Sequence, residues 1–248
     1  MIKKPLSMIL MCLYLCLCLA VPAYSDDGDA ILQKVDRNLN PEVFEMYRKL
    51  INLEPDGSKK EFIMFTIKKG REQVASVFLS PASEKGRATL RLGENMWLYI
   101  PNVGKPIRIT SLQSVTGGIF NNADIMRLDY SAEYNCEKME QKEGLLLLHL
   151  KAKTRFVAYD SLKMWVDDKK LLPDKIECFA SSGMLIKTLY FKKITDFGDG
   201  LERPAVVETD SPLYKGYKSI MIFARMKKRD LPDEAFTLNF LPRVESLR

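Results

Sequence analysis

Proline and glycine punctuate residues 79–110 so closely that this stretch is constrained to short strands joined by turns. Ser80-Pro81 ends one strand, because proline has no N–H for a sheet ladder and restricts the residue before it. A loop at residues 93–95 separates predicted strands at 88–92 and 96–100. Residues 101–106, which contain two prolines and a glycine, form the next turn before a strand at 107–110. The sequence therefore predicts an antiparallel meander.

The strand between these two turns is apolar on both faces. Successive side chains alternate, so Met96, Leu98 and Ile100 point to one side of the sheet. Trp97 and Tyr99 point to the other side. Because neither face is polar, we expect this strand to be covered on both sides.

The rest of the chain continues the same pattern. An amphipathic helix is predicted after the acidic run at 26–29, because Ile31, Leu32 and Val35 recur at helical spacing. Residues 43–53 are compatible with a helix or a strand. A helical or irregular segment is expected at 111–130, and further strands are expected at 61–68, 73–80, 145–154, 161–167, 174–181, 184–194, 205–209, 219–226 and 236–241. So many consecutive strands indicate one antiparallel sheet, which must curl when it is wide.

Apolar residues on both faces recur at residues 145–148 and 220–224. Helices packed into the concave side of a curved sheet would cover one face, and any space that they left would be an apolar pocket. The alternative is that helices fill this space and the residues are ordinary core. The pattern alone favours ordinary core.

The middle of the chain carries a set of spaced residues: Ser80-Pro81, Gly86, the run from Asn95 to Pro101, Arg108-Ile109, Phe120, Asp124 and Tyr130. This set resembles the signature of the LolA-like family of outer-membrane lipoprotein-sorting proteins. Residues 31–38 are similar to the opening helix of that family, and residues 183–187 and 230–237 to its closing strands. Residues 121–126 depart from it, because relatives carry a Gly-Ser-Asp-Phe-Ser-Tyr-like run there.

The resemblance implies a mainly β (α+β) fold: a curved antiparallel sheet that forms an open half-barrel, with helices covering its concave side around a lipid-accepting cavity. The resemblance favours a strand rather than a helix at residues 43–53. It also favours an apolar pocket on the concave side rather than a completely filled core. It implies one domain over residues 26–248.

The implied function is a soluble, non-enzymatic carrier that shields the acyl chains of a lipoprotein or another lipid during transfer between envelope membranes. Met96, Leu98 and Ile100 are predicted to face the concave side. Arg108 could meet a headgroup or a membrane partner, or could be a surface cation at a strand end. The predicted ligand-binding residues are Met96, Trp97, Leu98, Tyr99, Ile100 and Arg108. The alternative function is an accessory protein that docks on a membrane exporter without carrying a ligand. Neither function requires a cofactor, a metal or a nucleic acid.

Catalytic motifs are sparse. His149 is the only histidine, and no serine or cysteine pattern around it suggests a nucleophile with its base. Asp124, Asp129 and Asp160 could be imagined as a cation site, but with 32 acidic residues such groupings arise by chance. An enzyme is therefore the third functional class, after a carrier and an accessory protein.

Residues 1–25 have the order of a secretory signal peptide. Lys3 and Lys4 precede an apolar run at 6–21, and small residues lie before a predicted cleavage site after Ser25. A membrane anchor is the alternative, but Pro22 interrupts the run short of a comfortable span. Lipidation at a cysteine in this run is disfavoured by the bulky leucine before each candidate. We therefore expect export to the periplasm.

Two properties of the mature chain leave alternatives open. Loss of Lys3 and Lys4 lowers the formal net charge from +6 to +4, which is mild. Basic clusters at 68–71, 192–193 and 227–229 could contact a membrane surface transiently or could simply be solvated strand ends. Cys136 and Cys178 could form a disulfide or remain as two separate buried thiols.

Overall fold

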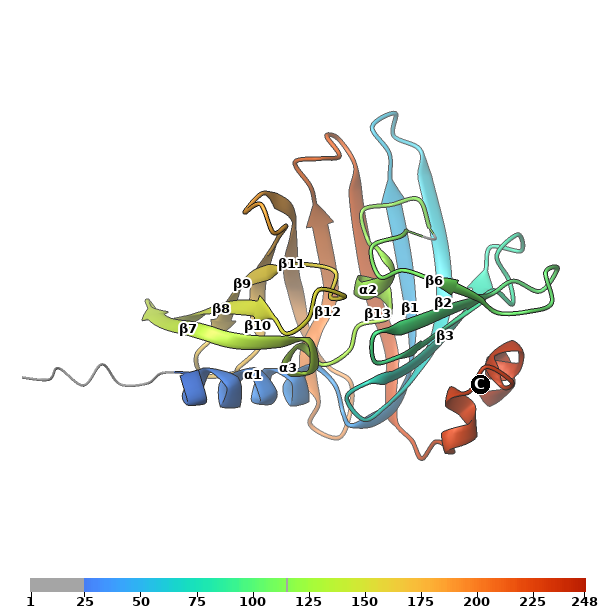
Figure 1. Ribbon diagram of the computed structural model, residues 1–248, viewed down its shortest axis with the longest axis horizontal. Helices are drawn as coiled ribbons and strands as arrows, with labels where there is room; N and C mark the ends of the chain where they lie inside the picture. The colour runs from blue at the N-terminus through green and yellow to red at the C-terminus, as the bar shows by residue number, and fades with distance from the viewer. Residues whose placement is uncertain (1–24, 115) are drawn as a thin grey trace, which may run out of the picture.

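The computed structural model describes residues 25–114 and 116–248. Within these residues, thirteen strands form one antiparallel sheet (Figure 1). The predicted signal peptide lies outside the described residues except for Ser25, at which the first helix begins.

The sheet is open, because its edge strands β6 and β7 do not pair with each other. Its spatial order is β6-β5-β4-β3-β2-β1-β13-β12-β11-β10-β9-β8-β7. The strands are β1 (Val43–Leu53), β2 (Lys59–Lys69), β3 (Gln73–Ser80), β4 (Ala88–Leu92), β5 (Asn95–Tyr99), β6 (Ile107–Ile109), β7 (Tyr134–Lys142), β8 (Leu145–Ala152), β9 (Ser161–Asp167), β10 (Pro173–Phe179), β11 (Leu185–Asp196), β12 (Glu202–Asp210) and β13 (Lys218–Lys228). This architecture confirms the predicted open half-barrel, including the strand at residues 43–53.

Helices cover part of each face of the sheet. α1 (Ser25–Leu39) packs against β7 and β12, and α2 (Asn122–Ile125) lies inside the curve in front of β1 and β13 (Figure 1). α3 (Tyr130–Glu133) leads into β7. Two 3-10 helices, η1 (Asp233–Phe236) and η2 (Leu241–Leu247), pack against β3 and β4.

The main hydrophobic core lies on the concave side. It joins Leu32, Val35 and Leu39 of α1 to residues from both halves of the sheet, including Met64, Phe78, Leu148 and Met164. A second core lies on the convex side of the sheet. There, the strand side chains that point away from the concave core pack against the two 3-10 helices. Its members include Phe65, Ile67, Val77, Leu90, Phe236, Phe240, Leu241 and Val244. Burial on both faces explains why several strands are apolar throughout.

Strand β5 shows this division within five residues. Met96 belongs to the concave core, whereas Trp97 and Tyr99 pack against the convex core. Leu98 is also buried, on the same side as Met96 by alternation. The two-faced apolar strand is therefore covered on both sides, as its sequence predicts.

The strand predicted at residues 236–241, and the closing strand that the resemblance implied at 230–237, are wrong. These residues lie in or beside η1 and η2. Phe236, Leu238 and Phe240 alternate as they would in a strand, but Leu238 is 38% exposed while Phe240, Leu241 and Val244 are buried at helical spacing. The convex apolar face of β2 to β4 supplies the surface against which they pack.

Strand β7 was missing from the predicted elements. Only Tyr134 and Cys136 among its nine residues are buried, because β7 is an edge strand whose outer part carries charged side chains. Charged edges protect open sheets from unwanted pairing but remove the alternation that reveals a strand.

Candidate functional site

A small, partly enclosed cavity lies between the concave face of the sheet and the segment that crosses it. Its volume is about 40 Å³. At roughly 10–15 Å³ per water molecule on this measure, it has room for about three waters. One wall is formed by β1 and neighbouring strands, and the opposite wall by residues 120–127. The lining residues include Phe44, Met46, Arg48, Lys68, Phe120, Asp124, Arg127, Phe191, Arg203, Val207, Met221 and Phe223.

Arg48 of β1 is the most unusual residue of this lining. It occupies an inward position between Met46 and Leu50 and is only 3% exposed. Its Nη1 donates to the sulfur of Met221 at 3.8 Å. Within the part of the chain that the structure describes, its Nε and Nη2 have no hydrogen-bond partner. Buried polar atoms are normally paired, so an unpaired guanidinium edge at a cavity suggests a missing partner.

Two further arginines reach the same cavity. Nη1 of Arg203, on β12, donates to the carbonyl of Leu39 at 2.7 Å and to Oδ1 of Asn40 at 2.8 Å. The Arg203 guanidinium also stacks 4.3 Å from the ring centre of Phe223. Arg127, which follows α2, donates to the hydroxyl of Tyr130 and lies 3.8 Å from the Asp124 carboxylate.

The positive charge of these arginines is poorly compensated. Burial, reinforced by repulsion from Arg127 and Arg203, lowers the pKa of Arg48 to about 9. Burial and repulsion from Arg127 also lower the pKa of Arg203 to about 9. Neither Arg48 nor Arg203 forms an ion pair with a carboxylate among the described residues. Both remain protonated at neutral pH, so this wall of the cavity is cationic.

The other buried charges near the cavity are paired. Lys68 of β2 contacts the buried carboxylate of Asp129, which Arg37 of α1 also contacts. Burial lowers the pKa of Lys68, and attraction to Asp129 works in the opposite direction.

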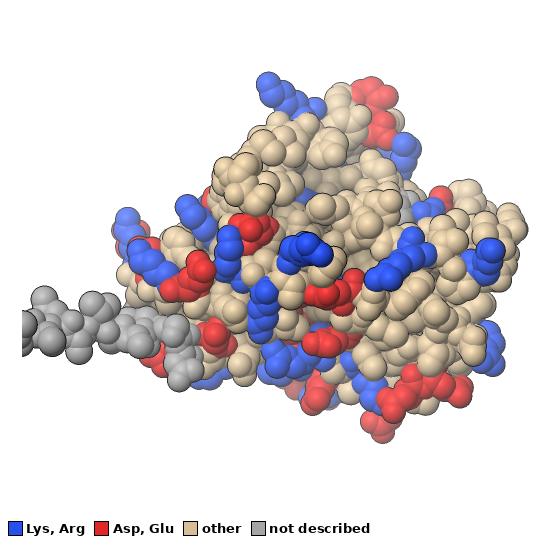
Figure 2. All heavy atoms as spheres, viewed as in Figure 1, with Lys and Arg blue, Asp and Glu red and all other residues tan. Residues whose placement is uncertain are grey.

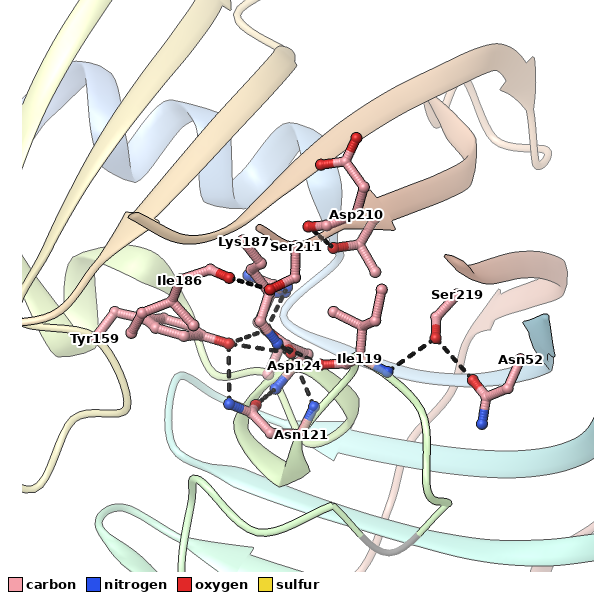
Figure 3. A network of polar contacts seen from close by, with 12 residues as sticks. Asn52, Ile119, Asn121, Asp124, Tyr159, Ile186, Lys187, Asp210, Ser211 and Ser219 are labelled. Carbon is pink, nitrogen blue, oxygen red and sulfur yellow. Dashed lines mark hydrogen bonds and ion pairs between the residues drawn. The ribbon is translucent and has the colours of Figure 1, made fainter. Parts of the chain in front are cut away.

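Residues 116–127, which we call the plug segment, close the cavity from the concave side. Its central anchor is Asp124, on which several side chains converge in Figure 3. Nζ of Lys187 donates to Oδ2 of Asp124 at 2.7 Å and to the carbonyl of Ile119 at 2.6 Å. The Tyr159 hydroxyl donates to Oδ1 of Asp124 at 3.0 Å. Burial favours the neutral carboxyl, but Lys187 and Arg127 outweigh it and lower the pKa of Asp124.

A second anchor joins the plug segment to β13 and β1 (Figure 3). Ser219 accepts from the amide of Ile119 at 3.0 Å and donates to Oδ1 of Asn52 at 2.8 Å. Nδ2 of Asn52 donates to the carbonyl of Thr116 at 3.0 Å. Gly118 lies so close that a Cβ there would come within 2.1 Å of Asn52 Oδ1, so this approach requires glycine.

Residues 121–126, where the sequence departs from the family pattern, form α2 and the positions flanking it. Asn121 caps this helix: its side chain accepts from the Asp124 amide, and the Asp124 side chain accepts from the Asn121 amide, each at 3.0 Å. The unusual run therefore provides both the turn and the buried anion that fix the plug segment.

The six predicted ligand-binding residues lie elsewhere. Met96 and Leu98 face the concave side but do not line the cavity, and Ile100 follows the end of β5. Trp97 and Tyr99 face the convex core. Arg108 is exposed on the edge strand β6, where it contacts the side chain of Asn95. Their roles in ligand binding stay predictions.

Sequence reasoning missed the three arginines. One signal was available for Arg48, because this charged residue lies between the apolar residues Met46 and Leu50 at the same alternating positions of the strand. No local signal marks Arg127 or Arg203, since their proximity depends on how the sheet curves and where the plug segment crosses it.

The remaining candidates for chemistry have simpler roles. Nε2 of His149 lies 2.8 Å from the Glu140 carboxylate on the neighbouring strand. Among the described residues, no group of three or more side chains is arranged to hold a metal ion. Each acid considered as a cation ligand is paired with a lysine: Asp124 with Lys187, Asp129 with Lys68, and Asp160 with Lys151.

Cys136 and Cys178 are free, buried thiols, so the disulfide is not formed. Burial, with the nearby carboxylate of Asp29, raises the pKa of Cys136 to about 11. Burial also raises the pKa of Cys178. Both thiols therefore lack the thiolate character that makes cysteine reactive.

The surface seen from the concave side mixes charges of both signs (Figure 2). Several basic residues of the predicted clusters are paired, including Lys69 with Asp233, Lys192 with Glu208 and Arg229 with Glu45. Over the described ranges, none of the helices combines the length and apolarity needed to cross a bilayer.

Comparisons with known proteins agree on one fold. The matching family model, described only as an uncharacterized protein, covers residues 70–243. A LolA superfamily protein from Nitrosomonas europaea is 30% identical, with a TM-score of 0.78 over 86% of this chain and 99% of that chain. A domain from Vibrio parahaemolyticus, named for outer-membrane lipoprotein sorting, is 19% identical, with a TM-score of 0.74 over 88% of this chain and 100% of that chain.

A DUF1329 family protein from Desulfovibrio piger has the same fold at 20% identity, with a TM-score of 0.74 over 88% of this chain and 98% of that chain. The comparison with curated proteins finds no match.

Proposed function

Because the chain belongs to the LolA superfamily, we propose that it is a periplasmic, non-enzymatic carrier that holds an acyl chain on the concave side of its sheet during transfer between envelope membranes. The acyl chain would come from a lipoprotein or another lipid. The observation that carries this proposal is that the plug segment crosses the concave side, packs Phe120, Ile125 and Met126 into the concave core, and is fixed there largely by polar contacts.

The apolar part of the cavity wall has the chemistry that an acyl chain requires. Phe44, Phe191, Phe223 and Met221 line it from the sheet, and Phe120 lines it from the plug segment. Burying each CH₂ group is worth about 0.8 kcal/mol. A carrier competes with a membrane only if it buries most of the chain, so a large continuous apolar surface is needed.

The cavity must enlarge to hold a chain, since about 40 Å³ accommodates only a few atoms. Phe120, Ile125 and Met126 of the plug segment are buried in the concave core, in the space that a chain would need. We infer that the plug segment moves aside and that the ligand replaces its apolar contacts. The anchors at Asp124 and Asn52 would then hold the empty form closed.

A reversible crosslink tests this motion. In the double variant Asn52→Cys/Gly118→Cys, the new thiols lie where Gly118 and the Asn52 side chain already touch. When oxidised, this variant should exclude a fluorescent fatty-acyl probe, and reduction should restore binding. The buried Cys136 and Cys178 should not interfere. The single variant Asn52→Cys, carried through the same oxidation, is the control.

Equal probe binding by the oxidised and reduced double variant would refute the motion of the plug segment. Failure of the unmodified protein to bind any acyl probe, together with native mass spectra free of lipid, would refute the carrier. That result would favour an accessory protein that docks on a membrane exporter without a ligand.

A further inference from the structure

The cavity contains the donor groups that an anion-binding site requires, on the Arg48 guanidinium. Nε and Nη2 form one edge of the Arg48 guanidinium, and this edge is the two-pronged donor that matches two oxygens of a carboxylate or a phosphate. Both atoms are buried and lack a partner among the described residues, while Nη1 is turned toward the sulfur of Met221. The vacant donors are therefore the pair suited to bidentate binding.

The charges around this edge favour an anion. Arg203 and Arg127 line the same cavity, and among the described residues Arg127 is the one of the three arginines that lies near a carboxylate, that of Asp124 in the same lining. Asp124 itself is committed to Lys187, whose Nζ is 2.7 Å away. A buried cation without a counter-ion is unfavourable, and an anion in the cavity would relieve the mutual repulsion of the three guanidinium groups.

Size and surroundings restrict which anion fits. A cavity of about 40 Å³ accommodates a carboxylate or phosphate group without any displacement of the plug segment. The polar part of the lining is formed mainly by the arginines, Lys68 and Asp124, whereas Phe44, Phe120, Phe191 and Phe223 offer an apolar surface that an attached hydrocarbon chain would contact. The combination fits an amphiphile whose acidic group is its innermost part.

We propose that Arg48, assisted by Arg203 and Arg127, binds the oxyanion of an acidic amphiphile, so that the protein carries its ligand with the head group buried and the chain directed toward the plug segment. This inference rests on the proposed carrier function and adds to it the chemical class of the ligand. The shared chemistry is the carboxylate or phosphate oxyanion, whether it belongs to a lipid or to free inorganic phosphate.

Paired ligands that differ only in charge test the inference. Dodecanoate and dodecanol should be compared by displacement of an uncharged fluorescent probe, and inorganic phosphate by its effect on the melting temperature. For the unmodified protein we expect dodecanoate to bind at least about tenfold more tightly than dodecanol, from the strength of charge-assisted hydrogen bonds.

The variant Arg48→Met removes the charge and keeps an apolar side chain of similar length. It should lose about tenfold or more in affinity for dodecanoate and change little toward dodecanol. Arg225→Met, on the exposed part of β13, makes the same change outside the cavity and should leave both affinities unchanged. If Arg48→Met does not fold, Arg203→Met and the comparison of the two ligands on the unmodified protein decide the question.

The possible failures are distinguishable. Equal affinity of the unmodified protein for dodecanoate and dodecanol would overturn the oxyanion site and leave the carrier intact. Stabilisation by phosphate that depends on Arg48, without binding of either amphiphile, would support the oxyanion site and overturn the carrier. Absence of all three responses would overturn both.

Discussion

The ion pair between Lys187 and Asp124 should be among the strongest single contributions to the closed form. We predict that Lys187→Met destabilises the protein, because it leaves the Asp124 carboxylate buried without its main counter-charge. The lysine side chain is 3% exposed and the aspartate 1%, so solvent cannot replace the lost partner. The variant also removes the hydrogen bond to the carbonyl of Ile119.

The size of the destabilisation follows from the contacts that Lys187→Met removes and from those that Asp124 keeps. Two hydrogen bonds to a charged group are lost, each worth about 1.5–3 kcal/mol. Asp124 keeps the Tyr159 hydroxyl and the Asn121 amide, both at 3.0 Å. The expected loss in unfolding free energy is therefore about 3 kcal/mol at pH 7, near the lower limit for breaking a buried pair.

The loss should depend on pH in a defined direction. In the unmodified protein the pKa of Asp124 is lowered below 3.8, so its contribution is present at neutral pH and is lost only as the pH falls through that lowered value. Without Lys187 the pKa of Asp124 should rise, because burial is then opposed mainly by Arg127. The variant should then regain stability as the pH falls toward 4 and the carboxyl is protonated.

Urea unfolding followed by tryptophan fluorescence measures these effects at both pH values. Lys192→Met is the matched control on the same strand: Lys192 pairs with Glu208 at 2.6 Å, but both side chains are more than a third exposed. Its expected cost is at most about 1 kcal/mol. If Lys187→Met cost no more than this control at pH 7, the reasoning about buried charge in the plug segment would be refuted.

Three further predictions concern other parts of the molecule. Burial and the nearby charge of Asp129 raise the pKa of Asp36 to about 6, so stability should decline as pH rises from 4 to 6, and Asp36→Asn should flatten that decline in urea titrations. Cys136 and Cys178 should resist a thiol reagent until the protein is denatured, and rapid labelling of native protein would contradict their burial. Leu98→Asp should abolish acyl-probe binding while Lys163→Asp should not, with thermal melting used to detect unfolding; a folded Leu98→Asp protein that bound the probe normally would exclude this strand from the ligand site.

Much of the sheet could be predicted from the sequence because its signals are local. β3 and β4 have the predicted bounds, Gln73–Ser80 and Ala88–Leu92, since alternation and the flanking turn residues are properties of a few neighbouring positions. β7 could not be found, because an edge strand with one exposed face and many charges has no such alternation. Residues 236–241 showed the alternation of a strand yet became helical, because the convex face of the sheet was available to bury a different set of side chains.

The candidate site was likewise only partly predictable from the sequence. The sequence by itself determines that a helical or irregular segment around Asp124 interrupts the strands, and once residues 43–53 are a strand, Arg48 must face the same side as Phe44, Met46 and Leu50. Only the tertiary structure decides that Arg48, Arg127 and Arg203 meet at one cavity and that Lys187 neutralises Asp124. Alternation is set by the backbone of each strand, whereas the meeting of charges far apart in the chain depends on the curvature of the whole sheet and on the path of the plug segment across it.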